Sequence, residues 1–281
     1  MEDKKKSIIT ASDVAEAIES AVPLSLQETW DNSGLIIGFP KAHVGKILTC
    51  LEITEAVADE AVSADADMIV SHHPLIFSGI KQLNYGRGED RSVMKLISNC
   101  ISVYSCHTPF DKVKGGNNDI IAEKLGLVSV KNLRGKDIVS ASKMAENGDE
   151  ADIGRIGRFR RPMNYMQVIE LAADRLGMSI SQLHACGNLS TQITMAGICT
   201  GAGADMADMA AEAGCQLFIT GDVKHHEAQD ALAKGICLLD AGHFGTEKFF
   251  GRAMKELLEK KLSGRVEIIE SAVNTDPFHI L

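Results

Sequence analysis

Short apolar runs alternate with amphipathic segments along most of the chain. Apolar residues at helical spacing over 12–21 predict a helix, and the apolar run 47–53 predicts a buried strand. Thr54 then offers an N-cap for a helix from residue 55 to about 64. The apolar run 68–70 completes a strand–helix–strand unit, for which parallel strands and a right-handed crossover are expected.

The rest of the chain continues this alternation. Further strands are expected over 101–106, 193–199, 217–220 and 236–239, and further helices over 92–98, 119–125, 164–176, 204–213 and about 245–262. The turn-rich stretch 30–34, ahead of the apolar residues 35–37, predicts a hairpin turn with Trp30 in the core. This order of elements is typical of an α/β fold with mixed, largely parallel sheets.

The second half of the chain repeats the first at one constant offset. The matching features are Cys50 with Cys199, Asp59 with Asp208, and residues 68–70 with 217–219. A charged, weakly periodic stretch lies between the halves. We therefore expect an N-terminal lobe (1–132), a linker (133–152) and a C-terminal lobe (153–281), which form one interlocked pseudo-symmetric unit.

Ligand-type side chains gather where the predicted strands end. His72 and His73 follow the strand 68–70, and Pro74 stops that strand because it lacks an N–H donor. The carboxyl ends of strands are where open α/β sheets place their ligands. Taken alone, two adjacent histidines are also typical of an ordinary polar turn.

Two further pairs share an i, i+4 spacing and match one another in the repeat. The pairs are His107 with Asp111, and His243 with Glu247, and each follows a predicted strand. Such spacing puts both side chains on one face if the segment is helical. The second pair is expected to open a helix, whereas Pro109 leaves a tight loop as an alternative for the first.

The collected side chains suit a metal centre that lies between the two lobes. They are His72, His73, Asp111, His243 and Glu247. Imidazole and carboxylate together favour Zn, Fe, Mn or Ni over Ca. Five ligands exceed the need of one tetrahedral ion and fit two divalent ions ~3.5–4 Å apart, an arrangement that activates water for hydrolysis.

Composition excludes several other classes of function. The net charge of −9 over 281 residues, with no basic face, argues against nucleic-acid partners. No apolar run reaches the ~20 residues of a membrane span, and the N-terminus lacks the apolar region of a signal peptide. Seven scattered cysteines without a CxxC pair indicate a reduced, cytoplasmic protein. The chain contains neither a phosphate-binding loop nor a G-x-S-x-G elbow.

Six motifs, in order, resemble the GTP cyclohydrolase 1 type 2 family, also called the Nif-three-like family. They are WDNSGL, SHHPLIF, HTPFD, TGDVKHHEA, GHFGTE and NTDPF, and they run from Trp30 to Phe278. The resemblance implies a two-lobed α/β protein with a dinuclear metal site, assembled as a toroidal homohexamer. The short link between the halves is similar to family members that lack a PII-like insertion.

The resemblance also assigns roles to individual residues. The family's ligands fall on the same five residues, and His107 is expected behind them together with His225. Asp222 and His226 are expected to face the metals as catalytic groups. Glu52 stands where many members have Asp, and no role is carried over to it.

Two functions of different classes remain open on the sequence. The first is a metal-dependent hydrolase of a nucleotide-like or other small polar substrate, in which Asp222 and His226 shuttle protons and Lys224 or Arg158 attracts an anion. The second is a non-enzymatic metal-binding protein that serves regulation, storage or partner recognition. They differ in the need for an open coordination position with proton-transfer groups beside it. The proton-transfer groups at the end of the strand 217–220 favour the enzyme, but nothing in the sequence selects guanine.

Overall fold

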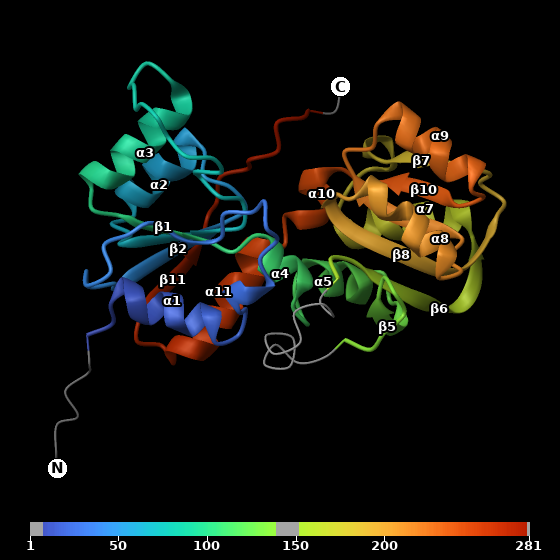
Figure 1. Ribbon diagram of the computed structural model, residues 1–281, viewed down its shortest axis with the longest axis horizontal. Coiled ribbons are helices and arrows are strands. Elements are labelled where there is room, and N and C mark those ends of the chain that lie inside the picture. Colours follow the sequence, from blue (N-terminus) through green and yellow to red (C-terminus); the bar gives the residue numbers. More distant parts are fainter. Residues whose placement is uncertain (1–7, 139–151, 280–281) are drawn as a thin grey trace, which may run out of the picture. The chain divides into compact units, whose positions relative to one another are not determined.

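The computed structural model describes residues 8–138 and 152–279 and divides the chain into two compact units (Figure 1). Unit 1 comprises Met1–Phe110 and Phe250–Thr275, and unit 2 comprises Asp111–Phe249 and Asp276–Leu281. Most of the expected linker, residues 139–151, lies outside the described residues. The lobe boundaries at 133–152 therefore stay a prediction.

Unit 1 is built on a five-stranded sheet in the order β1-β4-β3-β2-β11. Its strands are β1 (Gly34–Ile37), β2 (Lys46–Cys50), β3 (Met68–Ser71), β4 (Ser102–Ser105) and β11 (Glu267–Glu270). Neighbouring strands are parallel except for β1, which runs antiparallel to β4. Figure 1 shows α2 (Glu55–Ser63) and α3 (Gly88–Ser98) on one face of this sheet, and α1 (Ala11–Glu19) and α11 (Phe250–Leu262) on the other.

The expected strand–helix–strand unit is confirmed in β2, α2 and β3. Thr54 caps α2, because its side-chain oxygen accepts a hydrogen bond from the Val57 N–H at 3.3 Å. The strands on either side are parallel, and Leu48 and Ile69 pair in register as fully buried residues. Burial of these side chains against α2 and α3 forms the core on that face.

Unit 2 is built on a six-stranded sheet in the order β5-β6-β8-β9-β10-β7. Its strands are β5 (Val128–Asn132), β6 (Arg155–Asn164), β7 (His184–Cys186), β8 (Gln192–Ala202), β9 (Leu217–Gly221) and β10 (Cys237–Asp240). The strands β8, β9 and β10 are parallel, and the other pairings are antiparallel. The sheet is therefore mixed, as expected.

Helices cover both faces of the sheet in unit 2. The helices α5 (Asn117–Lys124) and α7 (Tyr165–Leu176) share one apolar core with Ile219, whereas α8 (Ala207–Glu212) and α9 (His225–Ala233) share another with Phe218. Successive residues of a strand point to opposite faces, so β9 contributes to both cores. A short helix, α10 (His243–Glu247), follows β10.

The internal repeat extends to the topology of the two sheets. The order β1-β4-β3-β2 in unit 1 matches β7-β10-β9-β8 in unit 2. In both cases three parallel strands carry an antiparallel edge strand that precedes them in the sequence. A short helix follows the third strand in each unit, α4 (Thr108–Lys112) after β4 and α10 after β10. The segment of the first H-x-x-x-D pair is thus helical rather than a tight loop. The helix tolerates Pro109 because this residue lies in the first turn, where a backbone N–H has no partner within the helix.

Three local expectations are wrong. Trp30 is 56% exposed rather than in the core, and β1 pairs with the distant β4 instead of forming a hairpin. The single helix expected over 245–262 is two helices, α10 and α11. The rings on either side of the boundary between these helices pack in different units. The Lys124 ammonium group makes a cation–π contact with Phe249 in unit 2, and Phe250 packs edge-on against Phe110 in unit 1.

Two broader observations complete the fold. Among the described helices, none combines the length and the apolar character needed to cross a membrane. All seven cysteines are free thiols.

Candidate metal centre

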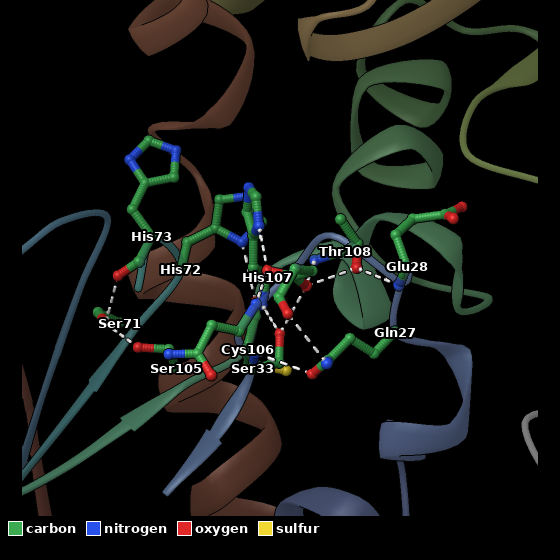
Figure 2. A network of polar contacts seen from close by, with 12 residues as sticks. Gln27, Glu28, Ser33, Ser71, His72, His73, Ser105, Cys106, His107 and Thr108 are labelled. Atoms are coloured by element: carbon green, nitrogen blue, oxygen red, sulfur yellow. Dashed lines mark hydrogen bonds and ion pairs between the residues drawn. The ribbon is translucent and has the colours of Figure 1, made fainter. Parts of the chain in front are cut away.

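Three histidines of unit 1 converge at one edge of its sheet (Figure 2). His72 and His73 follow β3, and His107 follows β4. The carboxyl ends of these parallel neighbours meet at the same edge, so the three rings come together although 34 residues separate His72 from Cys106, the residue before His107. Each ring offers one nitrogen, and these nitrogens lie within 4.8 Å of one another.

The fold fixes which nitrogen of His72 carries the lone pair. Its Nδ1 lies 2.9 Å from the Cys106 carbonyl oxygen, and a carbonyl only accepts, so Nδ1 donates. The ring is fully buried, and its centroid lies 4.9 Å from that of the Phe250 ring. The lone pair then lies on Nε2, which is the nitrogen that can bind a cation. Backbone contacts of this kind commonly orient metal-binding histidines.

A buried carboxylate orients His107 in the same way. Asp31 Oδ1 accepts from His107 Nδ1 at 2.8 Å, and its other oxygen accepts from the Thr108 N–H and hydroxyl at 3.1 and 2.6 Å. Burial alone would raise the pKa of Asp31, but hydrogen bonds from His107 and Thr108 outweigh it and hold the pKa well below its usual range. The group is therefore a carboxylate at neutral pH and directs the lone pair of His107 to Nε2.

Unit 2 presents a second group of ligand-type side chains. The i, i+4 pair in α10 places His243 Nε2 3.0 Å from Glu247 Oε2, and Glu247 is buried. Asp222 Oδ2 lies 2.7 Å from His243 Nδ1, so a carboxylate orients this ring as Asp31 orients His107. Asp222 adopts φ 54°, a left-handed conformation that is uncommon for residues other than glycine.

Asp111 completes the group in unit 2. One of its carboxylate oxygens lies within 4.8 Å of one from Glu247. Asn117 donates to Asp111 Oδ1 at 2.9 Å, and Asn118 donates to the Asp111 carbonyl at 3.0 Å. Asn118 Oδ1 also accepts from the Thr200 N–H at 2.9 Å, which ties this segment to the end of β8. The sequence predicted these residues as ligands but gave no sign of the amides that hold Asp111.

The backbone of Gly201 closes against this second group. A Cβ at this position would lie 2.4 Å from Glu247 Oε1 and 3.3 Å from His243 Nε2, and Gly201 has φ +67°. Only glycine meets both conditions. The backbone of Gly201 therefore lies directly against the ligand-type atoms of Glu247 and His243.

The donor chemistry of both groups fits divalent transition metals. Unit 1 offers three imidazoles, two of which are oriented through Nδ1, and unit 2 offers one imidazole with two carboxylates. Such sets suit Zn, Fe, Mn or Ni. Burial and the nearby carboxylates of Asp111 and Glu247 raise the pKa of Cys199 well above its usual value, so this neighbour is a neutral thiol in the absence of metal.

The other residues expected at the site lie outside these contacts. His225 and His226 begin α9 and are exposed, with ring centroids 5.4 Å apart. His226 Nδ1 lies 3.3 Å from the Gln229 side-chain oxygen, and Lys224 pairs with Glu227. The proton-transfer role of His226 and the supporting role of His225 stay predictions.

Glu52 and Arg158 were also considered in the sequence, and the structure places them in different units. Glu52 lies 3.9 Å from His73 Nδ1 and so borders the histidines of unit 1. Arg158 lies on β6, paired in register with Met195.

Asp31 was not predicted as a functional residue. The WDNSGL motif indicated only a turn, and the partner of Asp31, His107, lies 76 residues away.

The structure is that of an α/β protein with two units of matching topology. Each unit presents imidazole or carboxylate groups at its strand ends that could hold a metal ion. The Duf34/NIF3 (NGG1p interacting factor 3) family matches residues 9–277, and the chain belongs to this family.

Relatives and solved structures agree with this assignment. A Clostridium perfringens protein named "GTP cyclohydrolase 1 type 2 homolog" is 34% identical over 96% of this chain and 99% of its own. The protein NIF3 homolog of Schizosaccharomyces pombe is 30% identical over 95% of this chain and 96% of its own. The fold is similar to that of a Bacillus cereus protein related to NIF3, with a TM-score of 0.88 at 23% identity, over 98% of this chain and all of that one.

Proposed function

We propose that the chain is a metal-dependent hydrolase that holds two divalent ions and acts on a nucleotide-like or other small polar substrate. The proposed ligands are His72, His73, Asp111, His243 and Glu247, together with His107, one ring nitrogen of which lies within 4.8 Å of those of His72 and His73. The observation that carries the proposal is the orientation of the rings: His72, His107 and His243 each direct Nδ1 to a fixed acceptor. Orientation through one ring nitrogen prepares the other for a metal.

The surrounding residues of this chain have positioning roles in the proposal. Asp31 and Asp222 hold the rings of His107 and His243, respectively, and Gly201 allows the backbone to approach Glu247. Divalent ions at such a site would supply Lewis acidity and an activated water near neutral pH. Asp222 is also partly exposed, so in this proposal it can exchange protons with solvent as well as orient His243.

The names of relatives support hydrolysis and leave the substrate open. Proteins at 30–34% identity carry the name "GTP cyclohydrolase 1 type 2 homolog", which refers to a cyclohydrolase of GTP. The ligand groups of this chain are equally compatible with the non-enzymatic alternative, a metal-binding regulatory or partner-binding protein. Activity, rather than metal binding, separates the two.

An unbiased metabolite screen tests the enzymatic proposal. Metal-loaded protein is incubated with a small-molecule extract, and substrate loss and product gain are followed by mass spectrometry. We expect turnover that requires metal and is lost in Glu247→Gln. A protein that holds two ions yet converts nothing in the extract would favour the non-enzymatic function.

Assembly and location form part of the same proposal. We propose a closed homohexamer in the cytoplasm, on the basis of the family resemblance, the acidic composition and the free thiols. Light scattering should then give several times the 30.2 kDa chain mass, and a clean monomer at micromolar concentration would contradict the ring assembly.

A further inference from the structure

Two exposed aromatic side chains stand beside the histidines of unit 1. Trp30 and Phe77 are 56% and 50% exposed, with ring centroids 6.2 Å apart. Both rings contact His107 edge-on, with centroids at 5.9 and 6.5 Å. Large aromatic side chains gain stability from burial, so an exposed pair at a ligand-type cluster calls for a reason.

The backbone that carries Trp30 is firmly held. The next residue, Asp31, has a fully buried side chain that binds His107 and Thr108. Gln27 accepts from the Ser33 N–H at 2.9 Å and donates to the Asp31 carbonyl at 3.1 Å. The indole is therefore exposed on an ordered turn.

The same turn is tied to the segment that carries Phe77. The Asn32 side-chain amide donates to the Ile76 carbonyl at 2.5 Å. This bond fixes the spacing of two rings that are 47 positions apart in the chain. Trp30 and Phe77, both on ordered backbone, thus form an apolar aromatic surface, called here the aromatic wall, next to candidate metal ligands.

We propose that Trp30 and Phe77 bind a planar heteroaromatic ring of the substrate and place it beside His107. The inference rests on the proposed function and specifies its substrate class. Flat heteroaromatic rings suit this wall because stacking on an aromatic side chain is favourable for every nucleobase. An aliphatic substrate has no π-face with which to stack on the two rings.

Intrinsic fluorescence reads this site directly, because Trp30 is the single tryptophan of the chain. Guanosine, adenosine and nicotinamide mononucleotides are titrated into metal-loaded protein, with ribose 5-phosphate as the matched compound without a base. We expect at least one of the mononucleotides to quench Trp30 and to bind about 5- to 150-fold more tightly than ribose 5-phosphate, the usual scale of base–aromatic stacking. Equal affinity of all four compounds would overturn the inference.

Variants separate stacking from metal binding. Phe77→Leu should weaken mononucleotide binding but leave both the metal content and ribose 5-phosphate binding unchanged, whereas Tyr85→Leu removes another exposed ring of unit 1 and should change nothing. Trp30→Leu, followed by calorimetry, provides a second test. Full mononucleotide affinity in both Trp30→Leu and Phe77→Leu would contradict the inference, as would loss of metal in Phe77→Leu. A wild-type protein without metal would instead contradict the proposed function.

Discussion

Replacement of Asp31 by Asn tests the central positioning contact of unit 1. The carboxylate accepts hydrogen bonds from His107, Thr108, Ser33 and Asn32, all within 3.1 Å. An amide of the same shape has one acceptor oxygen, so either orientation turns an NH₂ group toward donors. One orientation opposes the Asn32 N–H and the other opposes the Thr108 N–H.

The expected loss of stability follows from those unsatisfied donors. At about 1–3 kcal/mol for each buried donor, plus the charge-assisted bond to His107, Asp31→Asn should lower the free energy of unfolding by about 2–4 kcal/mol. Metal affinity should fall by about 10–100-fold, because the partner that directs the His107 lone pair is weakened.

Two measurements check these values. Urea unfolding of metal-free protein gives the stability change, and titration against a chelator gives the metal affinity. Asp65→Asn is the matched control, since Asp65 is exposed and Asn tolerates its φ of 52°. A stability change below about 0.5 kcal/mol in Asp31→Asn, the scale of ordinary surface substitutions, would refute the reasoning.

Four further outcomes are expected. Gly201→Ala should reduce metal content measured by mass spectrometry, because its Cβ would meet Glu247, whereas Gly177→Ala shares a positive φ without any close contact and should keep the metal. Glu247→Gln should lose at least one ion, because an anion that offsets the repulsion between two dications is removed. Asp222→Asn should retain both ions at saturating metal and lower turnover by about 10²–10⁴-fold, the scale of general acid–base loss; ion loss even at saturation would make it a ligand. Without metal, the wild-type protein should exceed Asp31→Asn in free energy of unfolding by the full amount above about pH 4. This difference should shrink as the pH falls further, because folding lowers the pKa of Asp31.

Local signals in the sequence were sufficient for most of the fold. The alternation of apolar runs predicted β2, α2 and β3 and their parallel pairing, because each element is continuous and strongly patterned. In contrast, β11 has only two apolar residues between charges, and its partner β2 lies at the other end of the chain. Such a short edge strand is defined by tertiary pairing rather than by its own composition.

The candidate site shows the same division between local and distant signals. His72 with His73, and His243 with Glu247, could be predicted because neighbouring residues or one helical turn bring them together. The role of Asp31 could not, because its contact with His107 depends on how β1 and β4 pair. A turn motif in the sequence does not reveal which side chain will be buried beside a candidate ligand.

Metal content per chain tests the central claim most directly. Protein purified without chelator, and then reloaded with Zn, Mn, Fe and Ni in turn, is analysed by inductively coupled plasma mass spectrometry. The two ligand groups predict about two ions per chain with at least one of these metals. No bound ion after all four reloadings would contradict the metal centre, and a ceiling of one ion per chain would contradict its dinuclear form.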